Sequence, residues 1–142
     1  MPYLDLPGVN LWYNDTGSRT GTPVIFMHAA SGTCDCWVHQ VPVFMQAGYR
    51  CIAYDRRNWG RSRPTSTGGQ PGDVSDDLHG LVVHLNLDRF HIVATAAGGA
   101  GGLDYALAHP ERVRSLVIAS SIGGVQDPAY LEVQGRLRPP EI

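Results

Sequence analysis

Residues 91–99 read His-Ile-Val-Ala-Thr-Ala-Ala-Gly-Gly. The stretch starts within an apolar run, residues 90–94, which predicts a short strand buried in a sheet. Small residues follow at once, and a helix is predicted over residues 98–109 despite its four glycines. A strand that turns directly into a helix needs small side chains at the bend, because the two elements approach closely there. The stretch therefore predicts a tight strand-to-helix turn centred on Ala96.

This layout is that of a nucleophile elbow, G-x-S-x-G, in which the turn holds a nucleophile exposed above a sheet. Ala94 and Gly98 occupy the two positions that must be small, and Gly99 extends the small run. The place of the nucleophile itself is taken by Ala96. A methyl group cannot attack a carbonyl. The chain therefore has the backbone turn that presents a nucleophile but lacks the reactive atom. An ordinary Gly/Ala-rich turn of a Rossmann-like sheet is the alternative, but G-x-G-x-x-G does not fit the first strand-turn of this chain.

Three further motifs precede the elbow, and a fourth segment follows it. They are Tyr13-Asn-Asp-Thr-Gly17, Pro23-Val-Ile-Phe-Met-His-Ala-Ala30, Tyr54-Asp-Arg-Arg-Asn-Trp-Gly-Arg-Ser62 and His109-Pro-Glu-Arg-Val113. In this order and at these spacings they resemble the α/β-hydrolase family, close to its esterase, lactonase, carbon–carbon-bond hydrolase and haloperoxidase-like branch. The resemblance covers residues 9 to about 121.

The resemblance assigns roles to a few positions. It places the nucleophile at position 96 and the oxyanion donors at the backbone N–H of Ala97 and that of Ala29 or Ala30. The remaining site residues are expected beside the substrate: His28, Cys34 and Trp59. We interpret His28 mainly as a buried histidine that shapes its loop rather than as a proton-transfer group. In the family the segment around Asp55 is mainly structural, with Gly60 allowing the turn.

In a working triad of this family, the serine comes first along the chain, the acid (Asp or Glu) second and the His base third. The acid and the base would therefore lie beyond residue 142. The sequence therefore predicts residues 1–121 as the N-terminal part of a hydrolase core and residues 122–142 as the start of a lid. The last strand, residues 113–119, would remain as a long apolar edge, which is an association hazard unless it is covered. We expect it to pair with a second polypeptide that carries the C-terminal half of the hydrolase, with the acid and the His base.

Two explanations account for Ala96. A serine was replaced on purpose to silence the enzyme while its pocket was kept, or the alanine is natural and the fold serves as a non-catalytic binding module. The first explanation is favoured because the other motifs of the family are intact in this sequence. A third alternative is an Asp nucleophile, as in dehalogenases and epoxide hydrolases, although the Ala97-Gly98-Gly99 context is closer to the serine branch.

The wider pattern predicts an α/β fold, a mostly parallel sheet with helices on both faces and with the C-terminal strands absent from this chain. Apolar runs predict strands at residues 11–13, 24–27, 50–54, 90–94 and 113–119. Residues 14–21 read as turn residues and residues 56–72 as a loop. A helix capped by Asp35 is expected to start late or kink at Pro42, and a second helix is capped by Asp73. A short helix is possible within residues 128–138.

Composition narrows the function classes. The formal net charge is −2, and the eleven basic residues, all arginine, show no clustering, which argues against a nucleic-acid partner. Without lysine, Schiff-base chemistry is excluded within this chain. The start carries no signal peptide and no apolar run is long enough for a membrane span. Three cysteines give no disulfide framework, and Cys34-x-Cys36 lacks the second ligand pair of a zinc site. We expect a cytoplasmic protein that acts on a small molecule, with no cofactor and no metal.

Overall fold

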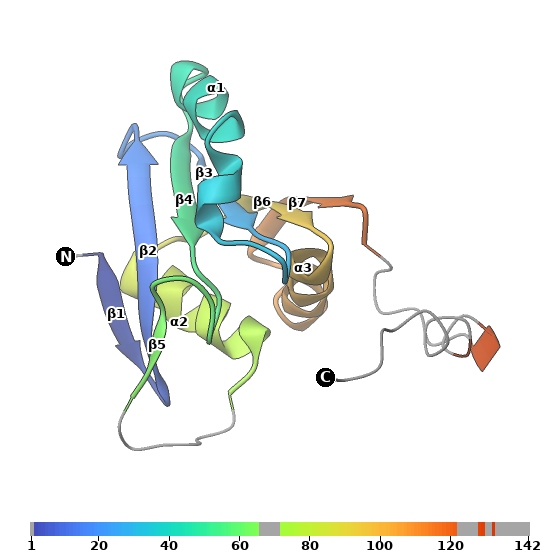
Figure 1. Ribbon diagram of the computed structural model, residues 1–142. Coiled ribbons are helices and arrows are strands. Elements are labelled where there is room, and N and C mark those ends of the chain that lie inside the picture. The colour runs from blue at the N-terminus through green and yellow to red at the C-terminus, as the bar shows by residue number, and fades with distance from the viewer. Residues whose placement is uncertain (1, 66–71, 122–127, 130–131, 133–142) are drawn as a thin grey trace.

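The computed structural model describes residues 2–65, 72–121, 128, 129 and 132, and a mixed sheet forms its centre (Figure 1). Within this part of the chain the strand order is β1-β2-β4-β3-β6-β7, and β5 pairs with β2. The strands are β1 (Tyr3–Leu6), β2 (Val9–Gly17), β3 (Pro23–Met27), β4 (Arg50–Tyr54), β5 (Arg63–Pro64), β6 (Phe90–Thr95) and β7 (Val113–Ala119). The helices are the 3₁₀ helix η1 (Cys34–Trp37), α1 (Gln40–Gln46), α2 (Val74–His84) and α3 (Ala97–Ala108).

The centre of the sheet is parallel, as the unbroken apolar runs predict. Strand β3 pairs in parallel with β4 on one side and with β6 on the other, and β6 pairs in parallel with β7. Ile25 of β3 lies opposite Ile52 and Ile92, and all three side chains are fully buried. The N-terminal strands β1, β2 and β5 pair antiparallel, and so does β2 with β4. The parallel part brings the carboxyl ends of β3, β4 and β6 to one edge, where ligands bind in open α/β sheets.

Helices cover both faces of the sheet, which confirms the predicted fold class. On one face, α2 and α3 pack on the larger cluster of buried side chains, to which Leu78, Leu81 and Tyr105 belong. On the other face, η1 and α1 pack on a smaller cluster around Phe26. The centroid of the Phe26 ring lies 5.4 Å from that of Trp37 and 5.4 Å from that of Phe44. The sequence also predicts the start of α2 correctly, because the Asp73 carboxylate accepts the backbone N–H of Asp76 at 2.8 Å.

Several local expectations are wrong. The segment read as turn residues continues strand β2 to Gly17, where Asp15 is held by Arg50 from the neighbouring β4. Strands β1 and β5 are not predicted at all, and β5 lies inside the expected loop. The helix expected to be capped by Asp35 is two elements, because the Thr33 hydroxyl accepts the Asp35 N–H and caps η1 instead.

The late start expected at Pro42 is confirmed. Helix α1 begins at Gln40, so Pro42 lies in its first turn, where a missing N–H breaks no helical hydrogen bond. Met45 of this helix is 39 % exposed. The lid segment, residues 122–142, and the short helix expected there lie largely outside the described residues.

The glycines of α3 allow the helix to approach the sheet closely, as expected. A Cβ on Gly98 would lie 2.5 Å from the Met27 carbonyl oxygen and 2.7 Å from that of His28. A Cβ on Gly101 would lie 2.6 Å from Val74 of α2. The helix therefore rests on backbone at the end of β3, and the stabilisation from this contact offsets the low helix propensity of glycine.

We predict that Gly98→Ala lowers the free energy of unfolding by about 3 kcal/mol, because the new methyl group meets rigid backbone rather than a movable side chain. Gly32→Ala is the matched control, since a Cβ there would meet no atom within 4 Å. Urea unfolding followed by circular dichroism measures both. Equal stability of the two variants would show that α3 does not depend on this contact.

Candidate active site

The bend at residue 96 is sharp, as the sequence predicts. Ala96 has φ 48° and ψ −119°, between the end of β6 and the first residue of α3. A positive φ is uncommon for a residue with a Cβ, and a conformation of this kind costs about 1–3 kcal/mol. Two hydrogen bonds hold the turn: Ala96 N–H donates to the Ala119 carbonyl at 3.0 Å, and Gly99 N–H donates to the Ala96 carbonyl at 2.9 Å.

Ala97 is the first residue of α3 and is exposed. Its N–H has no carbonyl partner within the helix, because the first N–H groups of any helix lack one. It also lies at the positive end of the helix dipole, where negative charge is stabilised. Position 97 therefore has the properties that an oxyanion donor needs.

The loop after β3 begins at His28, whose side chain is fully buried with both ring nitrogens engaged. Nε2 accepts the backbone N–H of Arg56 at 2.9 Å, so Nδ1 carries the proton and donates to the Ala29 carbonyl at 2.6 Å. Burial lowers the pKa of His28, and the positive charge of Arg56 lowers it further. The ring is thus neutral and bonded to backbone on both sides, in keeping with the loop-shaping interpretation.

The carbonyl groups of both alanines in this loop are held by side chains. His28 holds that of Ala29, and the indole N–H of Trp59 donates to that of Ala30. In a trans peptide the N–H points away from the carbonyl of the preceding residue, and the described part of the chain contains no cis peptide bond. Fixing the Ala29 carbonyl therefore fixes the direction of the Ala30 N–H on an exposed residue.

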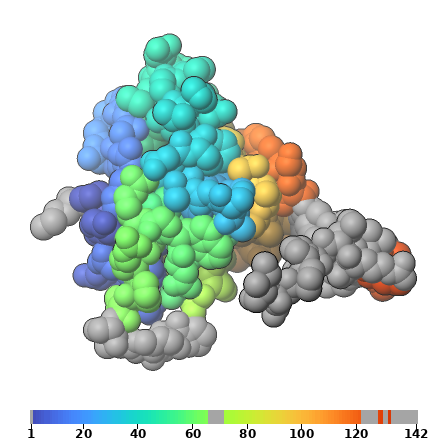
Figure 2. All heavy atoms as spheres, in the orientation of Figure 1, coloured from blue at the N-terminus to red at the C-terminus, as the bar shows by residue number. Residues whose placement is uncertain are grey.

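Asp55 joins the loop after β3 to the loop after β4. Its fully buried carboxylate accepts the backbone N–H groups of Cys34 and Arg61, each at 2.8 Å, and the Arg61 Nε at 3.1 Å. Burial alone would raise the pKa of Asp55, but these hydrogen bonds outweigh it and hold the pKa below its ordinary value. Gly60, at φ 52°, passes so close that a Cβ would lie 2.3 Å from this carboxylate. In Figure 2 both loops and the start of α3 lie side by side on one face.

Cys34, expected beside the substrate, lines a cavity of about 410 Å³ on the α1 side of the sheet. Trp12, Trp37 and Val41 contribute to the same walls. The Cys34 sulfur accepts from Arg61 Nη2 at 3.4 Å, and burial together with the nearby Asp55 raises the pKa of the thiol. Cys34 is thus protonated and unreactive, and it packs in a cavity that neither Ala96 nor Trp59 lines.

Four other histidines make their ring contacts and hydrogen bonds with residues outside the turn at Ala96. His79 stacks on His109 with ring centroids 4.3 Å apart, His84 bonds the Tyr13 hydroxyl and His91 bonds Ser115. The described residues form no cluster of three His, Cys, Asp or Glu side chains that could hold a metal. Among these residues, every helix is too short or too polar to cross a bilayer.

Sequence reasoning missed the two arginines after Asp55. Arg57 forms a two-point ion pair with Asp77 of α2, with nitrogen–oxygen distances of 2.9 and 2.7 Å. Arg56 is only 5 % exposed and lies against the Trp59 ring, 4.7 Å from its centroid. Adjacent arginines beside a structural carboxylate look like surface charges in a sequence, so no pattern distinguished them.

Comparison with known proteins decides the family. The sequence profile of the alpha/beta hydrolase fold matches residues 22–141. The chain belongs to the α/β-hydrolase family. Over 116 residues it is 38 % identical to a non-heme chloroperoxidase of Streptomyces lividans, covering 81 % of this chain and 42 % of that protein. Over 125 residues it is 33 % identical to a 2-hydroxy-6-oxononadienedioate/2-hydroxy-6-oxononatrienedioate hydrolase of Paraburkholderia xenovorans, covering 85 % of this chain and 42 % of that protein.

A solved structure of a carboxylesterase from Nitrososphaera gargenis superimposes with a TM-score of 0.83 at 27 % identity, over 95 % of this chain and 51 % of the esterase chain. The chain thus spans about two fifths of the length of the curated relatives it matches. The chain carries the turn at Ala96 and the loop after β3, and the family profile overlaps the predicted extent of the resemblance over residues 22–121.

We predict that Ala96→Gly raises the free energy of unfolding by about 1 kcal/mol, because glycine adopts this positive φ without steric cost. Ala100→Gly, within α3, is the control and should lower it by about 1 kcal/mol. Denaturant unfolding of the two variants and the parent chain measures both changes. A loss of stability in Ala96→Gly as large as in the control would mean that residue 96 is not strained.

We also predict that the chain loses stability as the pH falls below about 6.5. The pKa of His28 is lowered in the folded state, so the unfolded chain binds more protons in this range and protonation favours unfolding. Asp55 adds a loss of the same sign at lower pH, because its pKa is also lowered. Urea unfolding between about pH 8 and pH 5 measures the slope. His28→Gln should flatten it, whereas the exposed His39→Gln should not; an unchanged slope in His28→Gln would contradict the assignment.

Proposed function

We propose that this protein is the N-terminal part of an α/β-hydrolase that cleaves an ester, a lactone or a related carbonyl bond, with position 96 as the place of the nucleophile. The observation that carries the proposal is the backbone of Ala96, at φ 48° and ψ −119°. An alanine gains nothing from a strained turn, whereas a nucleophile there is presented above the sheet. The chain is catalytically silent in its present form because its residue 96 has no attacking oxygen.

The proposed oxyanion donors are the N–H groups of Ala97 and Ala30. Ala30 is favoured over Ala29 because its N–H belongs to the peptide whose carbonyl is fixed by His28. The N–H of Ala29 shares its peptide with the His28 carbonyl. That carbonyl faces the start of α3 at Gly98, so the Ala29 N–H points the opposite way. Trp59 is proposed to form part of the substrate wall and to hold the Ala30 carbonyl at the same time.

We propose a serine as the residue that Ala96 replaces, since the relatives named above include a carboxylesterase and a dioate hydrolase. The sequence of the gene from its natural source tests this directly: a serine codon supports the replacement, and an alanine codon supports a natural binding module. An aspartate codon would instead point to a relative of the dehalogenases and epoxide hydrolases.

The acid and base are proposed to come from a second polypeptide that pairs with β7, in the cytoplasm. Among the described residues, β7 has a paired strand on the β6 side only. Val117 of β7 is 53 % exposed, and beside it lies a groove of about 250 Å³ whose walls include Phe44, Tyr49 and Val93. An apolar edge beside an apolar groove is the surface that added strands and a helix would bury.

The test supplies a serine hydroxyl at residue 96 together with the C-terminal half of a hydrolase. We expect Ala96→Ser, combined with the segment of the Streptomyces lividans chloroperoxidase that follows its matched region, to hydrolyse p-nitrophenyl esters at least about 10³-fold faster than the Ala96 form with the same segment. Release of p-nitrophenolate measures the rate.

Ala97→Ser, in the complemented chain, is the matched control: it adds a hydroxyl one residue away and should give no turnover. Pull-down of the added segment on immobilised chain shows independently whether the two halves associate. Association without turnover in Ala96→Ser would count against the hydrolase. Ligand affinity without turnover would support the binding module.

A further inference from the structure

The carbonyl groups on both sides of the Ala30 N–H and Cα are held by ring nitrogens. His28 Nδ1 donates to the Ala29 carbonyl, and the indole N–H of Trp59 donates to the Ala30 carbonyl. Arg56 contacts both rings. Its backbone N–H donates to His28 Nε2 at 2.9 Å, and its guanidinium carbon lies 4.7 Å from the centroid of the Trp59 ring. One residue of the loop after β4 thus contacts both groups that fix the loop after β3.

The hydrogen bond from Trp59 to Ala30 is exposed, so water competes for both of its partners. A single bond of this kind contributes about 0.5–1.5 kcal/mol, and the orientation of a large ring needs further contacts. A turn supplies one of them: the Trp59 N–H donates to the Arg56 carbonyl at 2.9 Å, and Asn58 within the turn has φ 67°. The turn brings the indole back over the Arg56 side chain, which is only 5 % exposed and therefore fixed.

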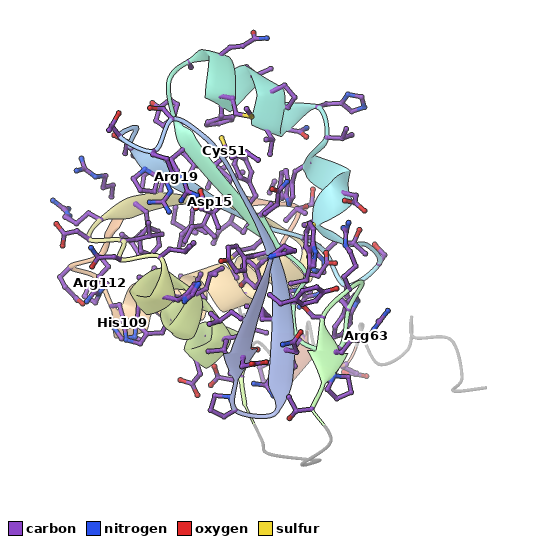
Figure 3. All side chains as sticks on the ribbon, turned by 90° about the vertical axis from the view of Figure 1, so that its left-hand side faces the viewer. Asp15, Arg19, Cys51, Arg63, His109 and Arg112 are labelled. Atoms are coloured by element: carbon purple, nitrogen blue, oxygen red, sulfur yellow. The ribbon has the colours of Figure 1, made fainter. Side chains whose placement is uncertain are left out.

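The Arg56 guanidinium has surroundings unlike those of Arg50 on the neighbouring part of the sheet. Arg50 binds the two oxygens of Asp15 at 2.9 and 2.7 Å, and Figure 3 labels Asp15 on its strand. The Nε and Nη2 of Arg56 are instead enclosed without a hydrogen-bond partner. Such burial costs stability, and the face of the Trp59 ring offsets part of the cost. The contact with the indole is therefore a favourable interaction that holds this guanidinium.

We propose that Arg56 is a positioning residue of the oxyanion site: its guanidinium holds the Trp59 indole in the orientation that binds the Ala30 carbonyl. A guanidinium suits this role, because its flat face is weakly hydrated and stacks on an aromatic ring. The role requires no contact between Arg56 and a substrate. The inference rests on the proposed function only for the importance of the Ala30 N–H in catalysis.

The test follows the hydrogen bond itself, by NMR of ¹⁵N,¹³C-labelled chain at neutral pH. A scalar coupling across the bond joins the Trp59 indole nitrogen to the Ala30 carbonyl carbon. We expect Arg56→Met to remove this coupling and to speed solvent exchange of the indole proton by about tenfold, as loss of one hydrogen bond allows. Arg56→Lys keeps the charge but not the flat face, and should give a smaller change in the same direction. Arg89→Met, which removes an exposed arginine, is the control and should change neither quantity. Unchanged coupling and exchange in Arg56→Met would overturn the proposal.

A double-mutant comparison shows whether Arg56 acts through the indole. Trp59→Phe keeps a ring but removes the N–H, and it should shift the ¹³C signal of the Ala30 carbonyl as Arg56→Met does. Adding Arg56→Met to Trp59→Phe should then shift that signal no further, because both changes break one bond. A further shift as large as that of Arg56→Met alone would mean that Arg56 acts on the loop by another route, and the positioning role would be rejected.

Kinetics of the complemented Ala96→Ser chain give the catalytic readout. We expect Arg56→Met to lower kcat about tenfold with little change in KM, because the oxyanion amides act mainly on the transition state. A raised KM with unchanged kcat would contradict the role in catalysis. Absence of turnover in every variant, with the NMR results as expected, would reject the proposed hydrolase and support the hold of Arg56 on Trp59. Turnover with unchanged indole exchange in Arg56→Met would reject this inference alone.

Discussion

A buried carboxylate joins the loops at the carboxyl ends of the central strands. Asp55 receives N–H groups from Cys34, which follows β3, and from Arg61, which follows β4, so two loops from different strands share one anchor. The charge can remain buried because three hydrogen bonds reach the carboxylate, one of them from the charged Arg61 side chain. Gly60 is required because no Cβ fits against the carboxylate at that turn. The loop that carries Ala29 and Ala30 is therefore anchored at its far end, where the Asp55 carboxylate binds the Cys34 N–H.

The second constraint is steric and acts from the helix side. Gly98 allows α3 to start directly against the carbonyl groups of Met27 and His28, so the first turn of the helix lies beside the loop after β3. The contact forces the chain at Ala96 through a positive φ, and the sheet holds it there through the hydrogen bond to Ala119. Both groups of the proposed oxyanion site, Ala97 and Ala30, thus occupy fixed backbone positions. Preorganised amides of this kind stabilise developing negative charge without reorganisation.

The sequence allowed the parallel centre, the helices on both faces and the bend at Ala96 to be predicted, because each has a local signature: an unbroken apolar run, a capping aspartate, a run of small residues. It did not allow β1, β5 or the second half of β2 to be predicted. Residues 14–17 are polar and resemble a turn, yet they extend β2 because β4 supplies backbone partners and Arg50 neutralises Asp15. The cavity that Cys34 lines is completed by Trp12 and Val41, which come from other parts of the chain and could not be placed beside Cys34 from the sequence. The burial of Arg56 depends on the surrounding side chains, which no spacing in the sequence reveals.

The shape of the turn at Ala96 does not depend on the side chain found there. Packing of Gly98 and hydrogen bonds to neighbouring backbone impose it, and all of these are made by atoms other than the Ala96 methyl group. A different side chain at residue 96, introduced in the laboratory or by a single codon change, would therefore be presented by the same backbone, with no refolding of the main chain.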